Sequence, residues 1–208
     1  MTETSVCFYK LKDFLKSTLQ THRNLEINLS GDQFDDRVMS IFSNAIVKCK
    51  QLSILGLYLS ECNINDNRAQ IIGSFLQSFA QLTKLTLKMS QNNLSHQGVL
   101  NLVSGLKQCT RLTTLSIVLN KNQIGDEAFI NLTLALGQCK SLTTLSIILH
   151  QNWISTKVVY LGNSLKNLIN LYCLEIDLNN NNFGEIAASR LGNSFKLLPK
   201  IKSLNLIL

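Results

Sequence analysis

The feature that most constrains this chain is a line of sequence that it repeats. Residues 112–124 read LTTLSIVLNKNQI, and residues 142–154 read LTTLSIILHQNWI. The residue that opens this line recurs as Leu52, Leu82, Leu112, Leu142, Leu171 and Ile201, in steps of 30, 30, 30, 29 and 30 residues. A degenerate copy begins at His22, so the period runs from about residue 22 to the end of the chain. Such a period predicts an array of stacked units that share one continuous core.

Each unit combines a strand pattern with a helix pattern. Apolar and other residues alternate from Leu115 to Leu119, which predicts a strand with one buried face. A helical stripe of apolar residues follows, at Ala128, Leu132, Ala135, Leu136 and Cys139. Segments with helix-capping residues begin at positions 65, 95, 125 and 155, just before each stripe. The single 29-residue step predicts a deletion in the loop or first helical turn after Ile154.

The segment LTTLSIVLNKNQIGDEAFINLTLALGQCKS resembles a leucine-rich repeat of the ribonuclease-inhibitor-like class. The resemblance rests on the spaced leucines, on Asn122, and on Cys139 three residues before the next opening leucine. It implies an α/β solenoid, a curved right-handed horseshoe with a parallel sheet on its concave face and helices on its convex face. The period is slightly longer than is usual for the family, with two extra residues before the asparagine. We therefore expect a longer strand and a deeper inner sheet face.

Two further columns of residues have structural interpretations. Asn92, Asn122, Asn152 and Asn181 share one position, which Cys62 takes in an earlier unit. A stacked amide has both donors and an acceptor, and can bridge buried backbone groups of successive turns. Cys49, Cys109 and Cys139 share a position with Phe79 and Leu168, so we expect buried apolar side chains. Without a C-x-x-C spacing, we expect no metal site, and we expect reduced thiols and a cytoplasmic location.

The ends of the chain differ from its middle. Residues 5–20 read as an amphipathic helix, so we expect a capping helix over 1–21 and a repeat array over 22–208, together one domain. The array of six to seven units ends on the apolar strand SLNLIL, without a capping unit. We therefore expect this edge to dock on another subunit or on a missing segment.

Composition and motifs exclude several classes of protein. Apolar residues make up 45% of the 208, but no run approaches the roughly 20 residues of a membrane helix. We find no arrangement of nucleophile, base or paired carboxylates typical of an enzyme, no Gly-rich phosphate loop, and no reason to expect a cofactor. Nucleic-acid binding is not expected, because Tyr58 beside Lys84 and Lys88 is the only basic and aromatic cluster on a strand.

Function is expected on the inner sheet face, where the repeat leaves residues free to vary. This face should be basic at Lys84 and Lys88, apolar at Val118 and Ile148, and acidic at Glu175 and Asp177. Trp153 lies in the variable position beside the asparagine column, and tryptophan is enriched at binding hot spots. The predicted partner-binding residues are Tyr58, Lys84, Lys88, Val118, Ile148, His150, Trp153, Glu175 and Asp177.

The leading hypothesis is a non-catalytic scaffold that binds protein partners, and a subunit of a larger assembly, such as a cytoskeletal or axonemal complex, is one form of this role. Fold alone does not choose among the functions of such repeats. The alternative is a regulatory protein such as a small-GTPase activator, which the resemblance implies would be acidic with an acidic tail. A nuclease inhibitor should also be acidic, to meet a basic enzyme. The net charge of +7 argues against both.

Overall fold

A computed structural model of the chain describes residues 5–208 and contains one parallel sheet of eight strands in sequence order. The strands are β1 (Val6–Phe8), β2 (Asn24–Asn28), β3 (Ile54–Tyr58), β4 (Lys84–Lys88), β5 (Thr114–Val118), β6 (Thr144–Ile148), β7 (Cys173–Asp177) and β8 (Ser203–Ile207). The α-helices are α1 (Leu11–Lys16), α2 (Asp36–Ile46), α3 (Asp66–Leu76), α4 (His96–Leu106), α5 (Asp126–Leu136), α6 (Val159–Leu165) and α7 (Glu185–Ser194). Short 3-10 helices are η1 (Leu19–Thr21), η2 (Thr156–Val158) and η3 (Phe195–Leu197).

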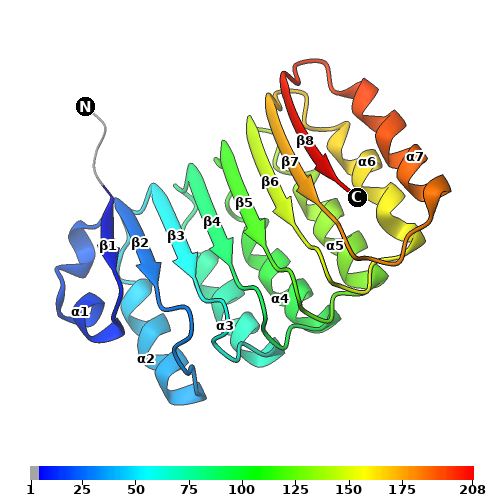
Figure 1. Cartoon of the computed structure of the whole chain (residues 1–208). Coiled ribbons are helices and arrows are strands. Elements are labelled where there is room, and N and C mark those ends of the chain that lie inside the picture. Colours follow the sequence, from blue (N-terminus) through cyan, green and yellow to red (C-terminus); the bar gives the residue numbers. More distant parts are fainter. Residues whose placement is uncertain (1–4) are drawn as a thin grey trace.

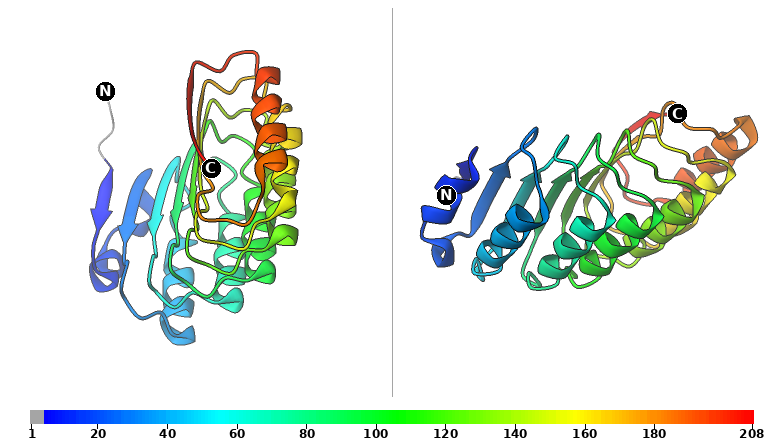
Figure 2. Two further views of the ribbon diagram at one scale, coloured as in Figure 1. Left: turned by 45° about the vertical axis from the view of Figure 1, so that its right-hand side comes forward. Right: turned by 90° about the horizontal axis from the view of Figure 1, so that it is seen from below.

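The helices from α2 to α7 form a row behind the sheet, and within residues 5–208 the other face of the sheet carries no helix (Figures 1 and 2). We call this uncovered concave side the open face. Strand pairing is in register with the sequence repeat: Leu55 pairs with Leu85, Leu85 with Leu115, and Leu115 with Leu145. Equivalent residues of successive units therefore lie side by side across the sheet.

The core lies between the sheet and the helices, as the apolar patterns predict. The leucines of the strands, Leu55, Leu85, Leu115 and Leu145, are fully buried. The helical stripe from Ala128 to Cys139 is also buried. Sharing this core between units gives each strand–helix pair the apolar partner that it lacks alone.

The asparagine column forms the expected ladder of hydrogen bonds. Asn152 Oδ1 accepts from the backbone N–H groups of Asn122 and Ile124, both at 3.2 Å. Its Nδ2 donates to the carbonyls of Leu119 at 3.1 Å and Leu149 at 2.9 Å. Asn92, Asn122 and Asn181 make similar bonds, and the Cys62 thiol donates to the carbonyl of Leu29 at 3.0 Å. Each amide thus links its own turn to the turn before it.

A sharp backbone turn precedes every rung of this ladder. The residue directly before each rung has a positive φ, at Glu61, Gln91, Lys121, Gln151 and Asn180, and Gly31 has a positive φ at the same position of the first unit. Glycine adopts this left-handed conformation most readily. In the five units without a glycine at this position, the surrounding structure must stabilise the turn. The longer strand that we expected is not regular β structure, because β5 ends at Val118. Hydrogen bonds to the next unit nevertheless continue, from Leu119 N to Ile148 O and from Lys121 N to His150 O.

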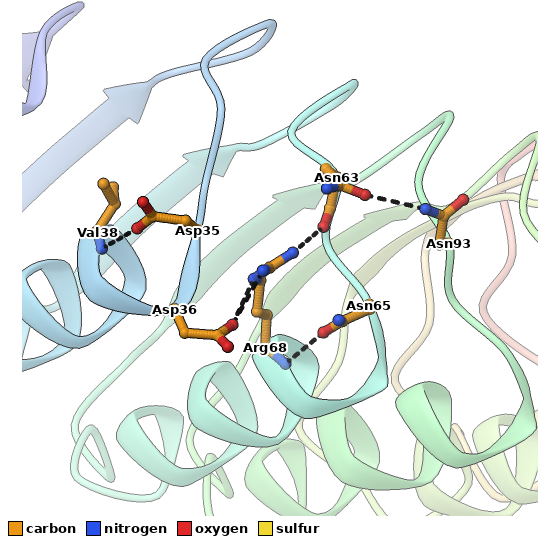
Figure 3. A network of polar contacts seen from close by, with 7 residues as sticks. All are labelled: Asp35, Asp36, Val38, Asn63, Asn65, Arg68 and Asn93. Carbon is orange, nitrogen blue, oxygen red and sulfur yellow. Dashed lines mark hydrogen bonds and ion pairs between the residues drawn. The ribbon is translucent and has the colours of Figure 1, made fainter.

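Capping and inter-unit contacts fix the starts of the first helices (Figure 3). Asp35 caps α2 by accepting from Val38 N at 2.7 Å, and Asn65 caps α3 by accepting from Arg68 N at 3.1 Å. The Arg68 side chain donates to Asp36 of the preceding helix at 3.0 Å and to the Asn63 carbonyl at 2.7 Å. This polar network is accounted for by helix capping and by the alignment of neighbouring units.

The N-terminal segment differs from the single helix expected over residues 5–20. Val6–Phe8 is the strand β1, which pairs with the edge of β2, and the helix α1 spans only Leu11–Lys16. Pairing with β1 gives hydrogen-bond partners to backbone N–H and C=O groups of β2 that would be unpaired at a free sheet edge. Phe8 also packs edge-on against Phe14 and His22, with ring centroids 5.6 Å apart in both pairs. Tertiary contacts thus override the helical pattern, and residues 1–4 of the expected cap lie outside the described residues.

The 29-residue step is absorbed where the sequence predicts it. In the units of α2 to α5, an α-helix of 11 residues begins directly after the N-cap. After β6, the first turn is instead the 3-10 helix η2, and α6 begins only at Val159. Because a 3-10 helix rises about 2.0 Å per residue instead of 1.5 Å, fewer residues cover the same length. Leu161 and Leu165 consequently return to buried positions.

Candidate functional site

The open face is built from alternate strand residues that point away from the helices. Three rows cross the sheet, and strand pairing defines each of them. The first row is Asn24, Ile54, Lys84, Thr114, Thr144, Cys173 and Ser203; the second is Glu26, Gly56, Thr86, Ser116, Ser146, Glu175 and Asn205; the third is Asn28, Tyr58, Lys88, Val118, Ile148, Asp177 and Ile207. Each row therefore consists of equivalent residues from successive units of the repeat.

The structure brings five of the predicted binding residues into one line. Tyr58, Lys88, Val118, Ile148 and Asp177 are consecutive members of the third row. Lys84 and Lys88 are exposed on β4, whereas Val118 and Ile148 are half-buried. The Lys88 ammonium lies over the Tyr58 ring, 5.3 Å from its centroid. The row therefore changes from aromatic and basic, through apolar, to acidic within five strands.

The acidic residues of β7 have partners within the protein. Ser146 Oγ donates to Glu175 Oε2 at 2.7 Å, and Asn205 Nδ2 donates to Glu175 Oε1 at 3.4 Å. Asp177 Oδ1 accepts from the backbone N–H of Asn179 at 3.0 Å. These contacts hold both carboxylates in place at the C-terminal end of the open face.

His150 and Trp153 lie beyond the end of β6 and outside the three rows. His150 is half-buried, and its backbone carbonyl accepts from Lys121 N. The side chain of Trp153 is 65% exposed, while its backbone bridges to Gly125. Most of the Trp153 surface is therefore accessible to a partner.

Sequence reasoning missed the N-terminal end of the open face. Cys7 pairs with Glu26 in the second row, and Tyr9 follows β1 with 69% of its surface exposed. Cys7, Phe8, Tyr9, Glu26, Asn28 and Tyr58 line a pocket there. Interpreting residues 5–20 as a helix hid this pocket. The β-branched and aromatic residues Val6 and Phe8 favour a strand, but three residues are too few to decide.

The cysteines are all free, and four of them are buried. Burial raises the pKa of Cys49, Cys62, Cys109 and Cys139 to about 11. These thiols are therefore protonated near neutral pH and behave as packing groups. Among residues 5–208, no group of three His, Cys, Asp or Glu side chains is arranged to hold a metal ion. In the same part of the chain, no helix combines the length and apolar character needed to cross a membrane.

The parallel sheet, the helices on one side of it and the buried leucines define a leucine-rich-repeat-like α/β solenoid. Among solved structures, the chain is similar to internalin C2 from Listeria monocytogenes, with a TM-score of 0.51 and 23% sequence identity. The match covers 90% of this chain and 63% of that chain, so this chain spans less than two thirds of the internalin's length. No family model matches the sequence, and the search of curated proteins found no significant match. The similarity supports the fold alone.

Proposed function

We propose that this chain is a non-catalytic interaction module that binds a partner protein through the open face. The observation that carries the proposal is the third row, where aromatic, basic, apolar and acidic side chains follow one another across five strands. Neighbouring strands lie about 4.8 Å apart, so these strands cover a width suited to a protein segment. The core positions of the same strands stay uniformly apolar, which leaves the row as the variable part of each unit.

We further propose that the repeats belong to the ribonuclease-inhibitor-like class and that the protein works in a reducing compartment. The pairing of strands 30 residues apart, or 29 between β6 and β7, supports the first assignment. The six free cysteines support the second, because free thiols are typical of reducing compartments.

The experiment compares two fourfold variants of the full chain by affinity capture with quantitative mass spectrometry. The open-face variant carries Lys84→Glu, Val118→Ser, Ile148→Ser and Asp177→Lys. The matched control carries the same kinds of change at exposed helix-side residues, namely Lys107→Glu, Ile41→Ser, Leu134→Ser and Glu127→Lys. We expect the open-face variant to lose the proteins that both the wild type and the control retain. Circular dichroism checks that each variant is folded, and unchanged capture by a folded open-face variant contradicts the proposal.

A further inference from the structure

We propose that the N-terminal end of the open face holds a pocket for one basic side chain, an arginine or a lysine, of the partner. The pocket has the Glu26 carboxylate among the rings of Tyr9 and Tyr58. This inference rests on the proposed function and names the chemistry of one contact within it.

The floor of the pocket follows from the second row. Cys7, Glu26 and Gly56 are neighbours on β1, β2 and β3. A Cβ on Gly56 would lie 3.0 Å from Tyr58 Cε2 and 3.1 Å from Glu26 Cγ. The Tyr58 ring and the Glu26 stem therefore both lean over the bare glycine. The missing side chain lets an aromatic ring and a carboxylate come together on the surface of the sheet.

The charge of this pocket has no cationic partner in the described part of the chain. The ion pairs found there are Arg68 with Asp36 and His96 with Glu127, and neither involves Glu26. The polar contacts of Glu26 near the pocket come from uncharged groups: the Tyr58 phenol hydrogen-bonds to it, and the Cys7 thiol makes a weak contact with Sγ 3.9 Å from Oε2. Burial, and next the negative charge of Glu26, raise the pKa of the Tyr58 phenol. The negative charge of the Glu26 carboxylate is therefore not balanced by a basic side chain at this end of the open face.

The aromatic walls suit a cation as well. A cation over the face of a tyrosine ring is attracted by the negative potential of that face. The Tyr58 ring already carries such a contact, because Lys88 Nζ lies 5.3 Å from its centroid. Lys88 belongs to β4 and Glu26 to β2, on opposite sides of the strand that carries Tyr58. The pocket formed by Cys7, Phe8, Tyr9, Glu26, Asn28 and Tyr58 does not include Lys88, so a second cation can reach the carboxylate.

The occupant is therefore defined by charge and shape. An anion would be repelled by Glu26, and a neutral apolar side chain would remove water from the carboxylate without supplying an opposite charge. A guanidinium or ammonium group pairs with Glu26, and its aliphatic stem packs on the exposed Tyr9 ring.

The test is a nuclear magnetic resonance titration of the isotopically labelled full chain with N-acetyl-arginine amide and N-acetyl-lysine amide. N-acetyl-citrulline amide, a neutral analogue of the arginine compound, is the control ligand. We expect saturable shifts at the amides of Cys7, Glu26 and Tyr58 with the two cationic probes, and none with citrulline. Glu26→Gln should weaken binding by about five- to tenfold, as expected for losing one opposite charge beside an aromatic cage.

The matched control variant is Glu175→Gln, which removes the other glutamate of the second row and should leave the titration unchanged. Tyr9→Leu is the second test variant, because its exposed side chain is not needed for folding; it should also weaken binding. Equal shifts with citrulline, or equal affinities in wild type and Glu26→Gln, overturn the pocket. The fourfold open-face variant leaves Glu26 and Tyr9 intact. If the fourfold variant loses its captured protein partner, and the wild-type chain shows no binding of the cationic probes, the pocket is refuted and the proposed function stands.

Discussion

The Asn152 amide shows how one residue type can hold a repeat array together. Four of its five hydrogen bonds, to Leu119, Asn122, Ile124 and Leu149, join buried backbone groups of two successive turns. These groups are shielded from water, so each of them needs a partner inside the protein. Asparagine is suited to this position because one short side chain carries both donor and acceptor atoms.

Replacing Asn152 by alanine should therefore destabilise the protein strongly. The backbone N–H groups of Asn122 and Ile124 lose their partner, so we expect a loss of about 2–4 kcal/mol in the free energy of unfolding. The carbonyls of Leu119 and Leu149 each keep a second donor, from Asn122 and Asn181. Urea denaturation followed by circular dichroism measures the change. The control is Asn67→Ala, on the exposed side of α3, which should change stability by less than about 0.5 kcal/mol. Equal effects of the two substitutions would show that the ladder adds no stability beyond that of a surface asparagine.

At this scale the sequence predicts scaffold residues better than site residues. The asparagine column is visible as a repeated letter, and the structure confirms its bridging role. Glu26 and Tyr9 carry no such mark, because neither belongs to a column of one repeated residue type and their neighbourhood depends on pairing between β1 and β2. The bare surface at Gly56, which brings Tyr58 toward Glu26, likewise becomes visible only in three dimensions.

At the scale of elements, an aspartate in the first turn of one helix holds the start of the next helix. Asp126 of α5 accepts hydrogen bonds from the backbone N–H of Ser155, at 2.7 Å, and from the Ser155 hydroxyl. Asp66 of α3 does the same for Ser95, with the backbone bond at 2.9 Å. The aspartate–serine contact thus occurs in every second unit. Comparing the residues at one position of the repeat does not reveal it, because the contact joins two positions in neighbouring units.

Asp126→Ala should loosen the junction between α5 and η2. It removes two charge-assisted bonds and a favourable charge at a helix N-terminus, and we expect a loss of about 1–3 kcal/mol. Asp126→Asn, which keeps one acceptor oxygen, should cost less. The matched control is Glu127→Ala, whose exposed carboxylate makes only a 3.5 Å contact with His96 and should cost about 0.5 kcal/mol or less. Thermal unfolding ranks the three variants, and an equal loss for Glu127→Ala would contradict this role of Asp126.

Strands and helices could be predicted from the sequence where the apolar pattern is long and repeated, but not where it is short. The period predicts strands and helices from β2 onward, and even places the one-residue deletion at the start of the helix after β6. It does not predict β1, whose three residues gain their conformation from the β2 edge and from the packing of Phe8. Nor does it predict where the strands end, because hydrogen bonding between units continues beyond Val118 into the left-handed turn at Lys121.

At the scale of the whole molecule, the two halves of the array are packed differently. In the described part of the chain, every aromatic ring pair falls between Phe8 and Phe79. The backbones of α3 and α4 also approach closely, since a Cβ on Gly73 would lie 2.0 Å from the carbonyl oxygen of Asn101. Because each unit of a solenoid contacts only its neighbours, we expect the N-terminal half to be the more resistant to unfolding.

Two equivalent core truncations test this expectation, because Leu55 and Leu145 occupy the same position on β3 and β6 and both are fully buried. Each change to alanine should cost about 2–5 kcal/mol through lost contacts and the cavity left behind. Leu145→Ala should release β6 to β8 while β2 to β4 stay protected, because the N-terminal half retains its own core. Leu55→Ala should weaken protection throughout, because it damages the half that supports the rest. Hydrogen exchange with mass spectrometry resolves the two patterns, and uniform loss of protection in Leu145→Ala would show that the array unfolds as a single unit.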